Sequence, residues 1–205
     1  MPFHTLFPTI IYDEILDIDN DTILNYCYEN RKENTKGLKG PYFSSKGVSN
    51  NSWRSESNIH KKTEFKLLVD AIQKRINLYH FNMGFKHQQL IQAMWINING
   101  QYSYNTVHTH GATSLAGSYY VKMPEDVANI NFFTPLVAYA HTNPKSFVAK
   151  PSDKNAAIHS VSPKEKQLLL FPSWLQHTVD MNQLDEDRIS IAFVASIVEN
   201  ARLVL

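Results

Sequence analysis

The chain has 205 residues, a formal net charge of +1 and 43% hydrophobic residues. This composition supports a sizeable core, and it gives no electrostatic reason to expect a nucleic-acid or membrane-surface partner. Its single cysteine, Cys27, excludes an internal disulfide and a cysteine-based zinc cluster. The sequence also lacks a secretory signal and an apolar run of roughly 18 residues, so we expect a soluble protein in the cytoplasm.

The first 84 residues predict a short strand, two helices and a long loop. Residues 3–12 are apolar and β-prone, whereas residues 19–34 begin with capping side chains and predict a helix. Residues 36–58 are rich in Gly, Ser, Asn and Lys, which is typical of a loop at a functional rim. The second helix is predicted by an apolar stripe with helical spacing: Phe65, Leu68, Val69, Ile72, Ile76 and Tyr79.

The residues after Gly84 predict strands, because β-branched and aromatic residues are enriched there between turn-like pieces. The predicted strands are 90–97, 102–110, 114–122, 130–134, 166–171 and 188–198. Helices followed by many short strands indicate an α+β fold, with a β-sandwich or jelly-roll core buttressed by N-terminal helices. We expect one domain over 1–205, in which 1–84 form the buttress and rim loop and 85–205 form the core. Trp95 and Trp174 are expected to be core residues.

Three histidines are the candidate metal ligands. His108 and His110 lie two residues apart on a predicted strand, so their side chains project from the same face. His177 follows an apolar segment containing a proline, which predicts an inward-facing position at a strand end. Neutral imidazole is the commonest protein ligand of transition metals, so this set indicates a metal site.

An arginine inside an apolar strand adds a second kind of site. Arg188, Ser190 and Ala192 share one face of the predicted strand, opposite the apolar side chains that alternate with them. Arginine is rarely buried without a partner, and its planar guanidinium suits a carboxylate. The pattern therefore predicts a pocket in which a metal and an anionic cosubstrate lie together, with the Ser190 hydroxyl available as a further hydrogen-bond donor.

Several segments together resemble the iron(II)- and 2-oxoglutarate-dependent oxygenases. Within them, the chain is similar to a family found in bacteria and in phages of marine cyanobacteria. The resemblance covers roughly residues 90–197, and its most specific parts are Phe-Pro-Ser-Trp-Leu-Gln-His at 171–177 and Arg-Ile-Ser at 188–190. Further matching segments are 95–97, 108–110, 115–121, 168–170 and 191–193.

This resemblance implies a double-stranded β-helix, or jelly-roll, catalytic core that binds Fe(II), 2-oxoglutarate and O2. His108 and His177 match the two histidines of the family's metal triad, and Arg188 with Ser190 match the residues that hold the distal carboxylate of 2-oxoglutarate. Four residues are further candidates for the cosubstrate pocket: Asn97, Tyr102, Asn105 and Tyr119. The resemblance also implies a hydroxylase in a bacterial or phage-infected cytoplasm.

His110 stands where the superfamily usually has Asp or Glu. Three neutral imidazoles leave a ferrous site at +2, and a 2-oxoglutarate dianion would neutralise it. Alternatively, His110 lies behind the ligands and water completes the sphere, or a carboxylate from elsewhere binds the metal, with Asp180 and Asp126 as candidates.

Two other functional classes compete with this interpretation. One is a cupin-like enzyme whose three histidines serve a reaction without 2-oxoglutarate. That class usually has a Glu shortly after His-x-His, whereas this chain has Gly111-Ala112-Thr113-Ser114-Leu115 there. The other is a non-enzymatic jelly-roll binding or virion module, which leaves an inward arginine unexplained. The substrate is not written in the sequence; the resemblance favours a prolyl residue of a protein or peptide.

Overall fold

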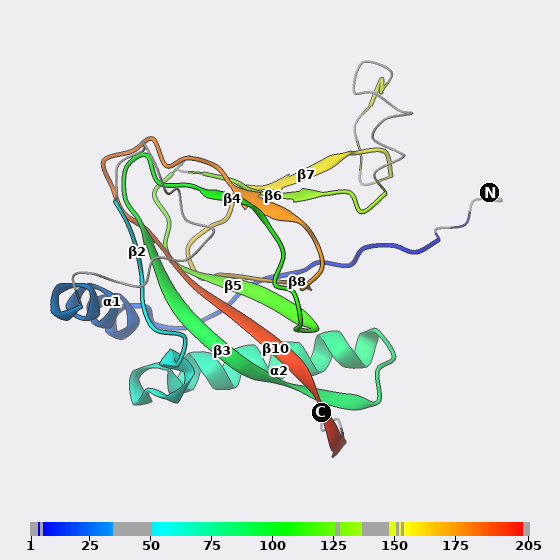
Figure 1. Cartoon of the computed structure of the whole chain (residues 1–205), viewed down its shortest axis with the longest axis horizontal. Coiled ribbons are helices and arrows are strands. Elements are labelled where there is room, and N and C mark those ends of the chain that lie inside the picture. The colour runs from blue at the N-terminus through cyan, green and yellow to red at the C-terminus, as the bar shows by residue number, and fades with distance from the viewer. Residues whose placement is uncertain are drawn as a thin grey trace.

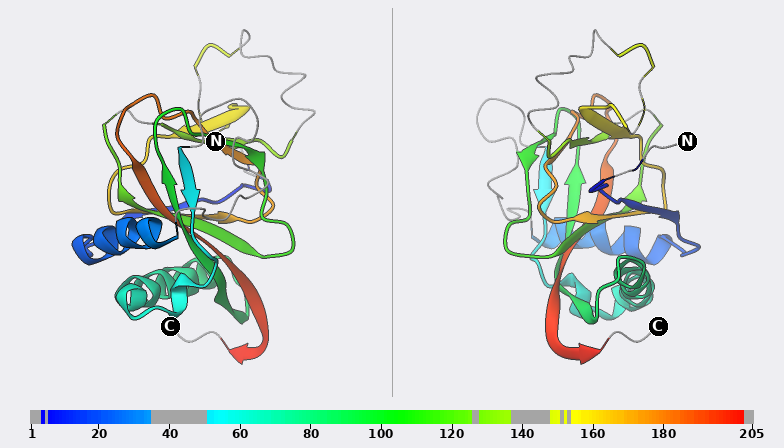
Figure 2. Two further views of the ribbon diagram at one scale, coloured as in Figure 1. Left: turned by 60° about the vertical axis from the view of Figure 1, so that its left-hand side comes forward. Right: turned by 90° about the vertical axis from the view of Figure 1, so that its right-hand side faces the viewer.

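The computed structural model describes residues 4, 6–34, 51–125, 128–136, 148–150, 152 and 154–202, with the backbone alone at 199–202. Its strands form two sheets that face each other (Figures 1 and 2). The six-stranded sheet has the order β1-β8-β5-β10-β3-β2. Its strands are β1 (Tyr12–Ile15), β2 (Ser52–Arg54), β3 (His87–Asn99), β5 (Leu115–Lys122), β8 (Gln167–Pro172) and β10 (Arg188–Arg202).

The four-stranded sheet has the order β4-β9-β6-β7. Its strands are β4 (Asn105–His108), β6 (Ile130–Phe133), β7 (Ile158–Val161) and β9 (His177–Val179). Every pairing between named strands in the two sheets is antiparallel. Two facing antiparallel sheets, with strands that alternate between them along the chain, form the predicted jelly roll.

The helices cover the outer face of the large sheet, opposite the small sheet (Figure 1). They are α1 (Asp21–Glu33) and α2 (Lys66–Asn82), and two 3-10 turns, η1 (Ile59–Lys61) and η2 (Thr63–Phe65), precede α2. The apolar stripe of α2 is buried as predicted, with Leu68, Ile72 and Ile76 fully inaccessible. Neither described helix has both the length and the apolar character that crossing a bilayer requires.

Two hydrophobic cores lie on opposite faces of the large sheet. The larger joins the helices to one face of β3, β5 and β10, through side chains such as Ile96, Tyr119 and Ile191. The smaller lies between the sheets and includes Tyr120 and Phe171. Because alternate residues of a strand face opposite sides, neighbours such as Tyr119 and Tyr120 belong to different cores. The inner face also carries the polar side chains of the candidate site.

The elements differ from the sequence predictions mainly at their ends. The first strand is β1 at 12–15 instead of 3–12, because these four residues pair with the edge of β8. The strand predicted over 102–110 starts only at Asn105, since Tyr102 has a left-handed backbone (φ 64) that interrupts an extended chain. Residues 52–54 of the predicted loop form β2, and its residues 36–50 lie outside the described residues.

The division at residue 84 also differs from the prediction. β1 and β2 come from the first segment, yet both join the large sheet, where β1 pairs with β8 and β2 pairs with β3. The first segment is therefore part of the jelly roll as well as its helical cover. That residues 1–205 form one domain stays a prediction.

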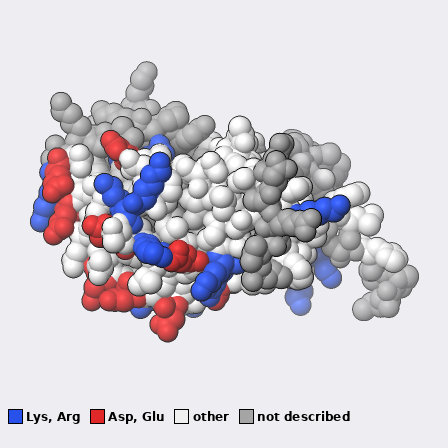
Figure 3. Space-filling view, turned by 90° about the horizontal axis from the view of Figure 1, so that it is seen from below, with Lys and Arg blue, Asp and Glu red and all other residues white. Residues whose placement is uncertain are grey.

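Charged side chains of both signs are interspersed on the face seen from below in Figure 3. Among the described residues on this face, no broad area of one sign stands out. That nucleic acid is not a partner stays a prediction.

An ion pair joins the first strand to the second helix. Arg75 donates from Nε to Glu14 Oε2 at 2.9 Å and from Nη2 to Glu14 Oε1 at 2.8 Å. The hydrogen bond from Arg75 lowers the pKa of Glu14 from 4.5 to about 2. Because the pKa of Glu14 is lower in the folded state, the stabilisation is present above pH 4.5 and is lost as pH falls toward 2.

We expect Glu14→Gln to lower the free energy of unfolding by about 1 kcal/mol at pH 7, since both side chains are about one-third exposed. Urea unfolding at pH 7 and pH 3 should show this difference shrinking at the lower pH. Asp70→Asn is the control, because its pair with Lys66 is exposed and should contribute less than about 0.5 kcal/mol. An equal effect of Glu14→Gln at both pH values would contradict the lowered pKa of Glu14 in the folded protein.

Candidate active site

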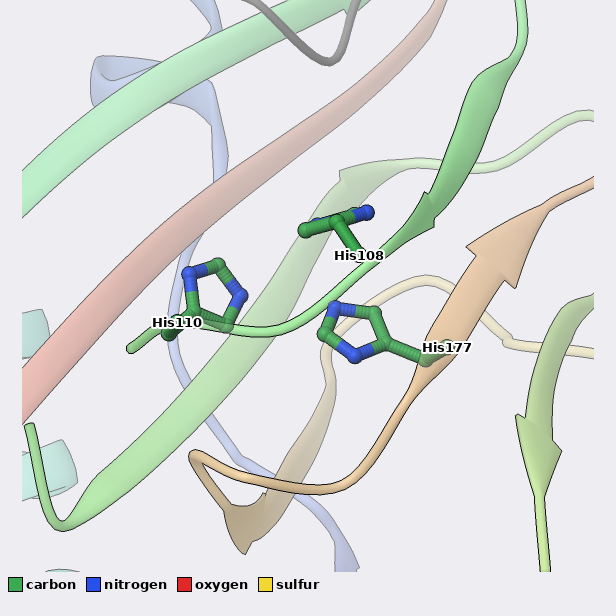
Figure 4. A group of neighbouring side chains, drawn as sticks. All are labelled: His108, His110 and His177. Atoms are coloured by element: carbon green, nitrogen blue, oxygen red, sulfur yellow. The ribbon is translucent and has the colours of Figure 1, made fainter. Parts of the chain in front are cut away.

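The three predicted ligands converge at the mouth of the jelly roll, between the two sheets (Figure 4). His108 ends β4 and His177 begins β9, and the two are direct partners in the small sheet. His110 lies beyond β4, where its backbone N–H donates to the Ser173 carbonyl at 2.9 Å. One ligand nitrogen from each ring lies within 4.8 Å of the other two. The prediction that His108 and His110 share one strand is wrong, but their rings still meet.

Backbone carbonyls orient two of the rings. His108 Nδ1 lies 2.7 Å from the Thr106 carbonyl oxygen, and His177 Nδ1 lies 2.9 Å from the Leu175 carbonyl oxygen. A carbonyl oxygen only accepts, so each contact selects the tautomer with the proton on Nδ1. That tautomer leaves Nε2 unprotonated, so Nε2 is the ring nitrogen that can bind a metal, as in most metal-binding histidines.

Burial keeps all three imidazoles neutral. It lowers the pKa of His108 below 6.5, lowers that of His177 to about 3 and lowers that of His110 to about 4. Neighbouring histidines contribute further to the last two shifts, and Arg54 also contributes to the shift of His110. Since an imidazole must be deprotonated to bind a metal, the cluster is ready to do so at neutral pH.

The two carboxylates considered as alternative ligands do not join this cluster. Asp180 is exposed, and its Oδ1 accepts a hydrogen bond from Asn131 Nδ2 at 2.7 Å. Asp126 lies outside the described residues. Among the described residues that line the cavity at the histidines, none is Asp or Glu. In this part of the chain, His110 therefore stands alone where a carboxylate would be expected.

The inner face of the large sheet forms the floor of this cavity, which has a volume of about 140 Å³. One row across the sheet runs from Asn97 of β3 through Ser190 of β10 to Tyr120 of β5. In the next row, Asn99 of β3 pairs with Arg188 of β10. All five side chains line the cavity. Strand register thus brings together polar groups that lie far apart in the sequence.

Arg188 is the strongest anion-binding candidate on this floor. It is 3% exposed, and its Nε has no hydrogen-bond partner among the described residues. Burial lowers the pKa of its guanidinium, whose Cζ lies 5.7 Å from the centre of the Tyr120 ring. Asn97 Oδ1 is also buried without a partner among these residues. A buried cation with an unused donor is costly, so the site fits an anionic ligand.

Two predicted pocket residues are placed elsewhere. Tyr119 belongs to the outer core, where its hydroxyl donates to Asn20 Oδ1 at 2.6 Å. Tyr102 is 46% exposed and does not line the cavity. Tyr119 faces the outer side of the large sheet, and Tyr102 lies in a turn before β4, so neither joins the cavity as predicted. Asn97, Asn105, Arg188 and Ser190 do line the cavity.

Sequence reasoning missed four of the lining residues: Arg54, Trp95, Asn99 and Tyr120. Tyr120 could have been found from the face shared by Arg188, Ser190 and Ala192, given that β5 pairs with β10. No local signal marked Arg54, because it lies in a segment that was predicted to be a loop. Trp174, expected in the core, is 52% exposed.

A family model described as "Putative 2OG-Fe(II) oxygenase" matches residues 93–194, a stretch that includes the three histidines and Arg188. The chain belongs to the 2OG-Fe(II) oxygenases. No curated protein matches it.

Solved structures share the oxygenase's fold. A Pseudomonas putida prolyl-4-hydroxylase is 10% identical, with a TM-score of 0.60 over 92% of this chain and 93% of that one. The viral collagen prolyl hydroxylase of Paramecium Bursaria Chlorella virus-1, in its 2OG complex, is 12% identical, with a TM-score of 0.57 over 91% and 96%. The epimerase SnoN, in complex with Fe3+, alpha ketoglutarate and nogalamycin RO, is 12% identical, with a TM-score of 0.61 over 92% and 79%.

The cofactors of the oxygenase are Fe(II) and 2-oxoglutarate, and the described residues fit both. Three neutral imidazoles form a suitable donor set, and the cavity that they line gives a further ligand access to them. The buried guanidinium of Arg188 suits the far carboxylate of a dicarboxylic acid. Without a carboxylate ligand, the ferrous site would carry +2, which one 2-oxoglutarate dianion balances.

The two neighbouring tyrosines of β5 should respond differently to loss of the hydroxyl. We expect Tyr119→Phe to lower the free energy of unfolding by about 1–3 kcal/mol, since it leaves the buried Asn20 Oδ1 unpaired. We expect Tyr120→Phe to weaken 2-oxoglutarate binding by less than about tenfold, with little change in stability. Urea unfolding and anaerobic 2-oxoglutarate titration measure the two effects. If Tyr119→Phe lost more 2-oxoglutarate affinity than Tyr120→Phe, the placement of Tyr119 outside the cavity would be wrong.

Proposed function

We propose that this oxygenase hydroxylates a C–H bond of a prolyl residue in a protein or peptide, in the cytoplasm of a bacterial or phage-infected cell. The observation that carries the proposal is one cavity lined by His108, His110, His177 and Arg188, whose Nε has no hydrogen-bond partner among the described residues. Prolyl substrates are favoured because two fold neighbours are named as prolyl hydroxylases.

In this proposal the three histidines hold Fe(II), and Arg188 with Ser190 holds the distal carboxylate of 2-oxoglutarate. When bound, iron and cosubstrate supply the hard chemistry: oxidative decarboxylation with O2 gives succinate and CO2 and makes one oxygen atom available for insertion into the C–H bond. The protein itself positions the reactants and keeps water out of the cavity. Apolar walls from Trp95, Phe171 and Ile130 line the cavity beside the histidines and limit water.

The surroundings of the site suit a substrate that approaches from solvent. Trp174 lies three residues before His177 and is 52% exposed, and Val107, next to His108, is 51% exposed. An exposed tryptophan combines a large apolar surface with one polar donor, and such residues often contribute strongly to binding a polypeptide. This supports a protein or peptide substrate over a metabolite that is fully enclosed by the cavity.

Anaerobic reconstitution tests the reaction class. The protein is loaded with Fe(II) and 2-oxoglutarate, the charge-transfer absorption band is recorded, and succinate is measured after air is admitted. We expect both the band and slow uncoupled succinate formation. Proline-containing peptides should then accelerate succinate formation and gain the mass of one oxygen atom. Absence of both the band and succinate would overturn the oxygenase assignment, whereas turnover without a peptide effect would overturn only the prolyl substrate.

The three-histidine donor set also favours a second candidate, a cupin-like metalloenzyme that does not use 2-oxoglutarate. In that alternative the buried guanidinium of Arg188 has no anionic ligand to bind. The same holds for a non-enzymatic jelly-roll binding or virion module. Binding of 2-oxoglutarate to the metal-loaded protein distinguishes these alternatives from the proposed function.

A further inference from the structure

A second guanidinium faces the same cavity. Arg54 comes from the edge strand β2, where it is the direct partner of Asn97 on β3. Asn97 in turn pairs with Ser190 of β10. Arg54 therefore extends the polar row of the cavity floor by one strand, to the edge of the large sheet.

The two arginines point to different parts of the cavity. Arg188 pairs with Asn99, on one side of the row that contains Arg54, whereas Trp95 lies on the other side of that row. The Arg54 guanidinium stacks over the Trp95 ring, with Cζ 4.5 Å from its centre. The Trp95 ring centre is 6.0 Å from that of His110. Arg54 is thus on the His110 side, away from the cosubstrate arginine.

The described residues leave one donor of the Arg54 guanidinium without a hydrogen bond. Its Nη2 donates to Ser57 Oγ at 3.0 Å, but its buried Nε has no partner among the described residues. None of the ion pairs found among these residues includes Arg54, and no described residue lining the cavity is acidic. Stacking on Trp95 stabilises the cation through the face of the guanidinium and does not use its N–H donors.

A 2-oxoglutarate molecule does not account for this second cation. Under the proposed function, one of its two carboxylates would bind the metal and the other would pair with Arg188. The cavity therefore offers one more cationic group than the cosubstrate uses. A positive group on the His110 side of the cavity, away from Arg188, is placed to bind the molecule that becomes oxidised.

We propose that Arg54, seated on Trp95, binds a carboxylate of the primary substrate and so positions the reacting C–H bond near the histidine cluster. The substrate class is then a carboxylic acid whose charged group lies close to the oxidised carbon, such as a carboxyl-terminal prolyl residue. The inference rests on the proposed function for the reaction, but the anion site is tested by binding alone.

The test compares acids with their uncharged amides on anaerobic protein loaded with Fe(II) and 2-oxoglutarate. The probes are N-acetyl-L-proline and N-acetyl-L-leucine, each paired with its primary amide, and calorimetry and the charge-transfer band report binding. We expect each acid to bind about 10- to 100-fold more tightly than its amide. Arg54→Gln should abolish this preference while 2-oxoglutarate still binds within about twofold. Lys62→Gln, which removes an exposed cation outside the cavity, should change neither.

The outcomes separate the two proposals. Equal binding of acid and amide by the unaltered protein, including no binding of either, overturns the carboxylate subsite. Loss of 2-oxoglutarate binding in Arg54→Gln also overturns it, since Arg54 would then belong to the cosubstrate site. A preference shown by the leucine pair as well as the proline pair supports the subsite independently of prolyl chemistry. Failure of 2-oxoglutarate to bind the unaltered protein would instead count against the proposed function.

Discussion

Replacing His177 with alanine is expected to abolish 2-oxoglutarate turnover and to weaken Fe(II) binding by more than about 100-fold. His177 is 3% exposed, and its ring lies closest to that of His108, with 4.2 Å between the ring centres. Replacing a residue that only orients a metal ligand typically weakens metal binding 10- to 100-fold. Replacing a ligand itself should therefore weaken it more. Anaerobic Fe(II) titration followed by succinate measurement in air provides the test.

The matched control is His159→Ala. His159 is an exposed histidine on β7 and lies outside the cluster, so its loss should leave Fe(II) affinity unchanged. Unaltered Fe(II) affinity in His177→Ala would show that the metal binds elsewhere.

His110 stands where a carboxylate ligand is usual, and one substitution tests whether it binds the metal. We expect His110→Asp to retain Fe(II) binding, because it creates the set of two histidines and one carboxylate that non-heme oxygenases commonly use. The added negative charge should weaken binding of the 2-oxoglutarate dianion, since the site charge falls from +2 to +1. Equal 2-oxoglutarate affinity in His110→Asp and the unaltered protein would indicate that His110 is not a ligand.

Replacing Arg188 with methionine is expected to have opposite effects on binding and on stability. The change should weaken 2-oxoglutarate binding by about 100-fold or more, because at least one charge-assisted hydrogen bond and a full charge are lost. It should also raise the free energy of unfolding of the apoprotein by about 1 kcal/mol or more. The reason is that Arg188 is buried with an unused donor, and an apolar side chain removes that desolvation cost.

For a chain of this length, a gain of 1 kcal/mol corresponds to roughly 2–4 °C in Tm. Calorimetry of the apoprotein and anaerobic 2-oxoglutarate titration measure the two effects, and Fe(II) affinity should change little. Lys122→Met serves as a control, because it removes a cation from β5 that does not line the cavity. An Arg188→Met protein that is less stable and still binds 2-oxoglutarate normally would refute the assignment.

Local patterns were sufficient to predict several features of the oxygenase. The apolar stripe around Leu68 and Ile72 predicted α2, because a helix that packs on a sheet must repeat its apolar side chains every three to four residues. Strand alternation predicted that Arg188 and Ser190 would face the same interior, and both line the cavity. The spacing of His108 and His110 predicted that their rings would meet, although the chain between them is only partly strand.

Other features depended on how strands pair. Which face of β5 is the inner one follows from its register with β10, where Tyr120 pairs with Ser190. This register turns Tyr119, which was predicted to line the pocket, toward the outer core. Arg54 reaches the site only because its short segment pairs with β3. The three residues of β2 lie in a polar stretch and are too few to show the alternation of apolar and polar side chains that predicts a strand.

The sequence by itself determined the ligand types, the inward arginine and the mixture of helices and strands, since each depends on spacing along one segment. The tertiary structure alone decided which neighbours complete the cavity and added Arg54 to it. The physical reason is that hydrogen-bonded register between strands is set by the packing of whole sheets, and a shift of one residue moves every side chain to the opposite face.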